Sequence, residues 1–280
     1  MYQYHFSAIT HPGCRPKGNE DNFYINGFYK KDPDAQFAHQ DGTISEGYVL
    51  ASVCDGMGGQ CLGEVASMIA VETLNEVFRK KHQDLSVEWL QTLIKEANRR
   101  VCRKMTEEKK RMGSTLSMVK IANDKMIAAN LGDSRIYRFR NGGLLQLSTD
   151  HTTVARLLRT GAITKEEAKM HPMRHQISQY LGIFPKEMIL EPAVTEISNI
   201  EDQDIYLLCS DGLTDMLEED EITAVLAAEK NITNAAKMLI EKANLAGGED
   251  NVTVVLIRAE ALEYKKNLFS LLRDKLHKGE

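Results

Sequence analysis

Short apolar runs of strand length alternate along the chain with longer segments whose apolar residues recur at helical spacing. The short runs are rich in aromatic and β-branched residues and are bounded by Gly, Asn, Asp or Pro, which is typical of strands. They predict strands at 2–10, 21–29, 48–54, 114–122, 125–131, 134–139, 144–148, 188–197, 204–210 and 251–258. Asn123-Asp124 and Asn141-Gly142-Gly143 are suited to hairpin turns between neighbouring strands.

Apolar spacings of three and four predict the helices. One helix is expected over 63–81 and a second over 87–110, where Ser86 is a suitable N-cap. Two more are expected over 219–229 and 233–246. A C-terminal amphipathic helix over 259–276 follows, with its stripe at Leu268, Leu272 and Leu276.

Two polar stretches interrupt this pattern. Residues 30–47 are predicted to form an exposed loop or hairpin, and residues 150–182, rich in His, Arg and Gly, a partly helical surface excursion. Blocks of strands are separated by helix pairs, without strict strand–helix alternation. The sequence therefore predicts an α+β fold with antiparallel sheets and segregated helical layers.

The chain shows no internal repeat and no long linker, so one domain over 1–258 is expected, with the helix within 259–280 packed on it. The formal net charge of −5 argues against nucleic acid or an anionic membrane as partner. No apolar run approaches the ~20 residues that cross a bilayer, and the N-terminus lacks the pattern of a signal peptide. Five cysteines without C-x-x-C spacing indicate reduced thiols and a cytoplasmic location.

Candidate chemistry is concentrated in five acidic clusters beside glycines at the ends of predicted strands. A single Asp-Gly pair is usually only a turn, but five clusters at strand ends are harder to explain in that way. They are Asn19-Glu20-Asp21, Asp55-Gly56-Met57-Gly58-Gly59, Gly132-Asp133-Ser134-Arg135, Ser210-Asp211-Gly212 and Gly248-Glu249-Asp250-Asn251.

Carboxylates gathered at one end of a sheet repel one another unless cations neutralise them. Oxygen ligands without histidine in any cluster favour Mg²⁺ or Mn²⁺ over Zn²⁺. Two such ions can clamp a phosphoryl oxygen and activate a bridging water, which suits phosphate-ester hydrolysis.

Other phosphate chemistries do not fit the spacing. No cysteine is followed by an arginine six residues later, so the loop of tyrosine phosphatases is absent. Gly13 and Gly18 have the spacing of a P-loop, but Asn19 and Glu20 replace its Lys and Ser/Thr.

Taken in order, the motifs resemble those of the metal-dependent Ser/Thr protein phosphatases of type 2C, in their compact bacterial form. The resemblance covers about residues 5–258, nearly the whole chain. Its motifs are N-E-D at 19–21, V-C-D-G-M-G-G at 53–59, M-G-S-T-L at 112–116, G-D-S-R-I-Y-R at 132–138, D-H-T at 150–152, C-S-D-G-L-T-D at 209–215 and G-G-E-D-N-V-T at 247–253.

The resemblance implies a four-layer αββα sandwich in which two antiparallel β-sheets are flanked by antiparallel helix pairs. It implies that Asp55 bridges two cations, that the Gly56 carbonyl binds one of them, and that Asp211 and Asp250 bind the other. Glu20 and Asp21 are then expected close by, through water. It further implies a third, weaker ion at Asp133 and Asp211, and a flap over about 150–182 that helps to choose substrates.

The chain departs from the type 2C pattern at three places. Pro16 occupies the position of the usual phosphate-binding arginine, which leaves Arg15 as the favoured candidate and Lys17 as the other. Met57 replaces the histidine that is a proposed general acid in eukaryotic relatives, so water or a flap histidine must protonate the leaving group. The segment 174–182 departs from the commoner N-x-I-T-R-x-L-G. The flap histidines are His151, His171 and His175.

The expected function is metal-dependent hydrolysis of phosphoserine and phosphothreonine on proteins, with Asp55, Asp211 and Asp250 as the catalytic residues. The alternatives are a pseudophosphatase that senses or scaffolds phosphoproteins, and a phosphatase of a small phosphorylated metabolite. The expected cofactors are two Mn²⁺ or Mg²⁺ ions with a possible third. A Ser/Thr kinase and its substrates are the expected partners of a monomeric protein.

Overall fold

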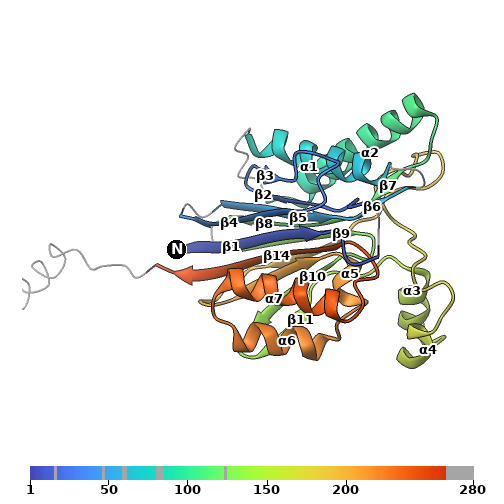
Figure 1. Ribbon diagram of the computed structural model, residues 1–280. Coiled ribbons are helices and arrows are strands. Elements are labelled where there is room, and N and C mark those ends of the chain that lie inside the picture. The colour runs from blue at the N-terminus through green and yellow to red at the C-terminus, as the bar shows by residue number, and fades with distance from the viewer. Residues whose placement is uncertain (16–17, 46–47, 59–61, 80–84, 123–124, 263–280) are drawn as a thin grey trace, which may run out of the picture.

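The computed structural model describes residues 1–15, 18–45, 48–58, 62–79, 85–122 and 125–262. Two six-stranded sheets lie face to face, and a pair of helices covers the outer face of each (Figure 1). All of the pairs between neighbouring strands are antiparallel. The predicted αββα sandwich is confirmed.

The first sheet has the strand order β11-β10-β13-β14-β1-β4. Its strands come from the two ends of the chain and from its middle, so the N-terminal strand pairs along its whole length with the last described strand. The strands are β1 (Tyr2–His11), β4 (Ala38–Ile44), β10 (Arg135–Arg140), β11 (Gly143–Gln146), β13 (Ile205–Cys209) and β14 (Val252–Ala261).

The second sheet has the order β12-β9-β8-β5-β2-β3. A short two-stranded ribbon, β6 with β7, continues from it at the end where β5 stops. The strands are β2 (Asn22–Ile25), β3 (Phe28–Tyr29), β5 (Tyr48–Cys54), β6 (Gly56–Met57), β7 (Gly113–Ser114), β8 (Leu116–Ala122), β9 (Lys125–Leu131) and β12 (Ala193–Ile197).

The long helices cover the sheets in pairs. The Ser86 hydroxyl accepts a hydrogen bond from the Trp89 N–H and caps α2, as its position in the sequence predicts. The helices are α1 (Gly63–Arg79), α2 (Val87–Glu108), α3 (Thr153–Arg159), α4 (Lys165–Lys169), α5 (Asp211–Thr214), α6 (Glu219–Ala228) and α7 (Ile232–Leu245). Within the described ranges, none of them combines the length and the apolar character that a membrane crossing requires.

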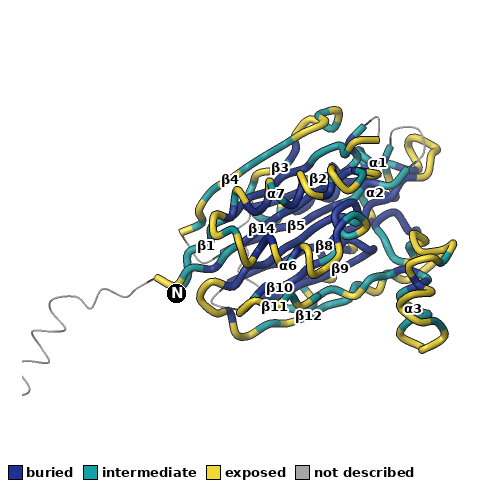
Figure 2. Tube along the Cα trace, turned by 60° about the horizontal axis from the view of Figure 1, so that its bottom comes forward, coloured by how far each residue is buried: buried dark blue, intermediate teal, exposed yellow. Residues whose placement is uncertain are grey.

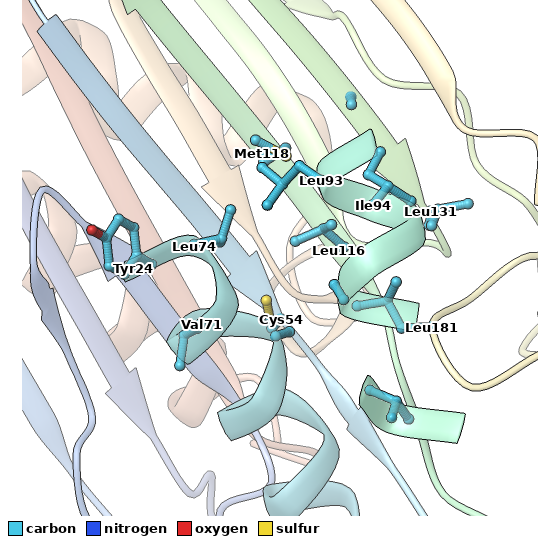
Figure 3. Packing of buried hydrophobic residues seen from close by; sticks show 14 of the residues in the cluster. Tyr24, Cys54, Val71, Leu74, Leu93, Ile94, Leu116, Met118, Leu131 and Leu181 are labelled. Carbon is cyan, nitrogen blue, oxygen red and sulfur yellow. The ribbon is translucent and has the colours of Figure 1, made fainter. Parts of the chain in front are cut away.

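Three apolar clusters hold the four layers together. One lies between the α1–α2 pair and the second sheet, where Leu74, Ile94 and Leu116 are almost completely buried (Figure 3). A second fills the space between the sheets, and a third lies under α6 and α7. Figure 2 shows the result, with buried strands inside and exposed residues along the helices, the loops and the α3–α4 segment. Burial of large aliphatic side chains supplies roughly 1.5–3 kcal/mol each, which favours this layering.

Several predicted boundaries were wrong. Residues 21–29 form two strands, because Asn26 and Gly27 have φ of 42° and 98° and make a tight turn between β2 and β3. The stretch 30–47, expected as a loop or hairpin, contains β4, which pairs with β1 at the edge of the first sheet. Its alternation of half-buried and exposed residues is typical of an edge strand with one solvated face.

Near the C-terminus, the predicted strand 251–258 is longer than expected. Strand β14 continues to Ala261, so residues 259–261 pair with β1 and are not helical. The rest of the predicted C-terminal helix, including Leu268, Leu272 and Leu276, lies outside the described residues, as does the Asn123-Asp124 turn. The Asn141-Gly142 turn is confirmed by positive φ at both residues.

Candidate active site

The acidic clusters meet at one end of the sandwich because of the strand registers. In the second sheet, Asn22 pairs with Cys54, which places Asp21 next to Asp55 where β2 begins and β5 ends. In the first sheet, Cys209 pairs with both Arg135 and Val254, so the end of β13 lies beside the starts of β10 and β14. Asp133 and Asp250 lie in the loops at those points, and Asp211 is the first residue of the short helix α5.

The carboxylates influence one another electrostatically. Burial raises the pKa of Asp55 well above its usual range, and the negative charges of Asp21, Asp211, Asp133 and Asp250 raise it further. Burial also raises the pKa of Asp211 well above its usual range, with the charge of Asp133 as the next largest cause. Such mutual repulsion in a buried place is what a cation would relieve.

Asp21 joins the two sheets. Its Oδ2 accepts hydrogen bonds of 2.7 Å from the hydroxyls of Ser210, at the end of β13, and Thr253, in β14. Burial raises the pKa of Asp21 to about 7, although the two hydroxyls act in the opposite direction. The carboxylate is therefore fixed in one orientation by residues from the opposite sheet.

Glu20 is held against the glycines of the Asp55 cluster. Its N–H donates to Asn251 Oδ1 at 2.7 Å, and its carbonyl accepts from the Ser67 hydroxyl at 2.6 Å. A Cβ added to Gly63 would lie 2.1 Å from Glu20 Oε2 and 2.7 Å from the backbone carbon of Gly56, and the backbone contact favours glycine there. Burial, with the charges of Glu64 and Asp250, raises the pKa of Glu20 to about 7.

The turn that carries Asp55 is fixed through its backbone. The Asp55 N–H donates to Thr115 Oγ1, and the Asp55 carbonyl accepts from the Thr115 N–H, both at 2.9 Å. Thr115 Oγ1 is in turn 2.7 Å from Ser134 Oγ. Gly56 is equally confined, since an added Cβ would lie 2.2 Å from the Gly63 carbonyl oxygen. The Asp55 carboxylate is left to face the other acids.

Two buried oxygens of the cluster have no hydrogen-bond partner among the described residues. Asp133 Oδ1 and Asp211 Oδ1 are buried and accept no hydrogen bond from the part of the chain that the structure describes. A buried carboxylate oxygen without a partner is costly, and neighbouring carboxylates increase that cost. Their donor set, oxygen atoms beside other carboxylates, fits a hard divalent cation.

Asp250 and Arg15 lie at the exposed side of the cluster. Asp250 Oδ1 accepts the N–H of Asn251 at 2.7 Å, and its side chain is accessible to solvent. The backbone of Arg15 donates to the Gly248 carbonyl, which holds this loop beside Asp250. The Arg15 guanidinium pairs with Glu249 at 2.9 Å and is 67% exposed. Lys17, the other candidate, lies outside the described residues.

The three flap histidines differ in their surroundings. Gly132 N–H donates to His151 Nδ1 at 3.3 Å, and burial lowers the pKa of His151. His171 is half-buried beside α4 and accepts from the Met173 N–H. His175 Nδ1 lies 3.5 Å from Asp215 Oδ2, close to Asp211.

Sequence reasoning missed the supporting residues. Thr115, Ser134, Ser210, Thr253 and Asp215 all stand inside the quoted motifs, but the motifs alone do not show which hydroxyl or carboxylate turns inward. His175 is predicted only as a candidate proton donor of the flap; its position within 4.8 Å of carboxylate oxygens of Asp211 and Asp215 was missed, because 36 residues separate it from Asp211.

Comparisons with known proteins agree with this geometry. Residues 34–246 match the protein phosphatase 2C family. The serine/threonine phosphatase stp of Listeria monocytogenes serotype 4b is 38% identical over 217 residues, covering 75% of this chain and 84% of the relative. The fold is similar to the serine/threonine phosphatase of S. agalactiae, with a TM-score of 0.78, 32% identity, and coverage of 91% of this chain and 98% of that one.

A further similar structure is the catalytic domain of the phosphatase PstP in complex with two manganese ions. Its TM-score is 0.76 at 30% identity, with coverage of 93% of this chain and 100% of that one. The chain therefore belongs to the protein phosphatase 2C family. It is a metal-dependent serine/threonine phosphatase that acts on phosphorylated proteins.

Proposed function

We propose that Asp55, Asp211, Asp250 and the Gly56 carbonyl hold two divalent cations at the end of the sandwich, with Asp55 shared between them. Glu20 and Asp21 support this pair through water. The observation that carries the proposal is the unpartnered, buried Oδ1 of Asp211 in a place where four other carboxylates repel it.

Bound there, the cations would neutralise the carboxylates and supply the positive field that activates water against phosphorus. The chain contributes a rigid frame. Thr115 and Ser134 fix the Asp55 turn, and Ser210 and Thr253 fix Asp21. Because these groups are ordered before substrate arrives, little reorganisation is needed during the reaction.

We propose Arg15 as the phosphate-binding residue. Its guanidinium is exposed beside the cluster, and a planar fork of N–H groups suits two phosphate oxygens. Its pairing with Glu249 costs little to break, since surface ion pairs contribute about 0–1 kcal/mol.

Solvent is the proposed proton source for the leaving alkoxide. The lowered pKa of His151 keeps its imidazole neutral near pH 7, which makes it a poor acid. The Nδ1 of His171 already accepts a hydrogen bond from the Met173 N–H.

We also propose a third, weaker cation at Asp133 and Asp211, supported by the unpartnered Oδ1 of each residue. The oxygen ligands suit both Mn²⁺ and Mg²⁺, so either ion is proposed to support turnover.

In the cell, the substrates must be supplied by a Ser/Thr kinase, which we propose as the functional opponent of this enzyme. The described cysteines are free thiols, which supports a reducing, cytoplasmic location. A single domain over 1–258 and a monomer are proposed. Large exposed apolar side chains are dispersed over β3, β11, the flap and loops, which is ordinary for a monomer.

Turnover of a phosphothreonine peptide with Mn²⁺, with and without chelator, tests the assignment. Asp55→Asn and Asp250→Asn are expected to lower kcat/KM by about 10³-fold, or ~4 kcal/mol of barrier. Asp220→Asn, an exposed aspartate in the first turn of α6, is the matched control and should keep parental activity. Parental turnover in Asp55→Asn would refute the assignment.

Rates on a panel of small phosphorylated metabolites, measured beside the peptide, test the substrate class. Faster turnover of a metabolite than of the peptide would contradict the proposed preference for phosphoproteins.

A further inference from the structure

The flap brings a nitrogen ligand to the rim of the carboxylate cluster. His175 follows α4 in a segment whose backbone is tied to the residues just after β11. The Thr153 N–H donates to the Gln176 carbonyl at 3.0 Å, and the Ser178 N–H donates to the His151 carbonyl at 2.7 Å. These bonds immediately C-terminal to the histidine restrict where its imidazole can reach.

The imidazole of His175 lies close enough to two carboxylates for all three groups to bind one cation. A nitrogen of His175, a carboxylate oxygen of Asp211 and one of Asp215 all lie within 4.8 Å of one another. His175 Nδ1 and Asp215 Oδ2 are 3.5 Å apart. Two ligands bound at about 2.1 Å in neighbouring octahedral positions lie about 3 Å apart, so small side-chain shifts would suffice.

Independent of that spacing, the oxygens nearby lack partners. Asp133 is only 7% exposed, and its Oδ1 accepts no hydrogen bond from the described residues. The same holds for Asp211 Oδ1. Burial raises the pKa of Asp211 most, and among the neighbouring charges those of Asp133 and Asp215 raise it further.

A simple ion pair between His175 and Asp215 does not account for this arrangement. Their separation of 3.5 Å exceeds the length of an ordinary N–H···O hydrogen bond. Such a pair would also leave the buried Oδ1 atoms of Asp133 and Asp211 without a partner. A cation among these groups would satisfy all of them together.

We propose that His175, together with Asp211 and Asp215, binds a first-row transition-metal cation such as Mn²⁺, and that the flap thereby becomes part of the metal centre. Imidazole is a poor ligand for Mg²⁺ and a good one for transition metals, so this position discriminates between the two ions. The inference rests on the proposed role of Asp211 as a cation ligand.

Calorimetric titrations of the full chain with Mn²⁺ and, separately, with Mg²⁺ provide the test. His175→Asn keeps a polar side chain of similar size but removes the imidazole. We expect it to weaken the weakest Mn²⁺ site at least about tenfold and to change Mg²⁺ affinity less than twofold. His171→Asn, four residues earlier in the flap, is the matched control and should leave both titrations unchanged.

A spectroscopic measurement makes the test independent of turnover. Addition of diamagnetic Zn²⁺ should shift the imidazole NMR signals of His175 while those of His171 stay in place. Parental Mn²⁺ affinity in His175→Asn, or an unmoved His175 signal, would overturn the proposal.

Asp55→Asn separates this inference from the assignment of the core pair. If Asp55→Asn retains parental Mn²⁺ binding, the core assignment fails. If Asp55→Asn loses the tight sites while His175→Asn loses nothing, only the flap ligand is wrong.

Discussion

An aspartate lies next to each end of strand β13, and the two aspartates have different hydrogen-bond partners. Asp204 precedes the strand and Asp211 follows it. Asp204 accepts from Arg140 Nε and Nη2 at 2.6 Å, from the Glu201 N–H at 2.9 Å and from the Tyr206 hydroxyl at 3.0 Å. Both of its oxygens are satisfied by the protein itself.

Asp211 has no such set of donors. Its Oδ1 accepts no hydrogen bond within the described residues, and its charged neighbours include other carboxylates. Asp204 therefore stabilises the fold at one end of the strand, whereas Asp211 at the other end has an oxygen available for an external cation. Completed hydrogen bonding distinguishes the two roles.

The largest effects on activity and on stability are expected when each of the two aspartates is replaced, one at a time, by asparagine. Asp211→Asn should lower kcat/KM on a phosphothreonine peptide about 10³-fold, because it removes a proposed cation ligand. Its metal-free stability should be unchanged or higher, since a source of repulsion is lost. Asp204→Asn should instead lower the free energy of unfolding by about 2 kcal/mol, because Arg140 loses its charged two-oxygen acceptor and keeps only Glu201 and the Asn199 carbonyl.

Chemical denaturation in chelator and steady-state kinetics with Mn²⁺ measure these two outcomes. If Asp211→Asn destabilises the metal-free protein as strongly as Asp204→Asn does, the proposed difference between the roles of the two aspartates is wrong.

The pH dependence of the metal-free protein sharpens the same contrast. Burial raises the pKa values of Asp21 and Asp133 to about 7, above the ordinary unfolded value near 4. The folded state then binds more protons than the unfolded state, so this stability is fully present below about pH 4 and is lost as pH rises through about 7. In chelator, the melting temperature should fall by roughly 5 °C between pH 5.5 and pH 8.

In excess Mn²⁺ the melting temperature should no longer fall between pH 5.5 and pH 8, because a bound cation keeps the carboxylates ionised in the folded state. In the metal-free protein, the melting temperature of Asp211→Asn should depend less on pH than that of the parent. The melting temperature of Asp204→Asn should be lower at every pH but should fall with pH as steeply as that of the parent. A metal-free protein that melts higher at pH 8 than at pH 5.5 would contradict this account.

The smallest expected effect concerns the two arginines. Arg140 is paired with buried Asp204, whereas Arg15 is paired with exposed Glu249. Glu249→Gln should leave stability within about 0.5 kcal/mol, since exposed ion pairs contribute little. It should lower KM for a phosphopeptide about two- to threefold, because Arg15 is released and a negative charge near the substrate disappears.

Arg15→Gln should raise KM for the phosphopeptide. In the double variant with Arg15→Gln, Glu249→Gln should no longer lower KM. Additive effects of the two substitutions would show that Glu249 does not act through Arg15.

Local signals in the sequence predict antiparallel sheets with separate helical layers, and the resemblance to the type 2C family supplies their arrangement as a sandwich. Apolar runs mark the strands, and Asp-Gly turns mark where they stop. The prediction fails for β4, because its weak alternation gives no clear local signal and its strand pairs with the distant β1. It also cannot separate Asp204 from Asp211, because the Arg140 that satisfies Asp204 is 64 residues away.

The flap shows the same limit. His175 resembles any surface histidine in the sequence, and only the backbone pairing of the flap brings it to Asp215. Long-range contacts, which depend on packing, decide which polar side chains become ligands.

The bonds from Ser210 and Thr253 to Asp21 have a consequence for biosynthesis. Strand β14, which carries Thr253, is the last described strand, yet it lies between β13 and β1 in the middle of its sheet. A growing polypeptide on the ribosome therefore has a gap in that sheet until residues 252–261 have emerged. Phosphatase activity should appear only then, so unfinished chains cannot dephosphorylate cellular proteins prematurely.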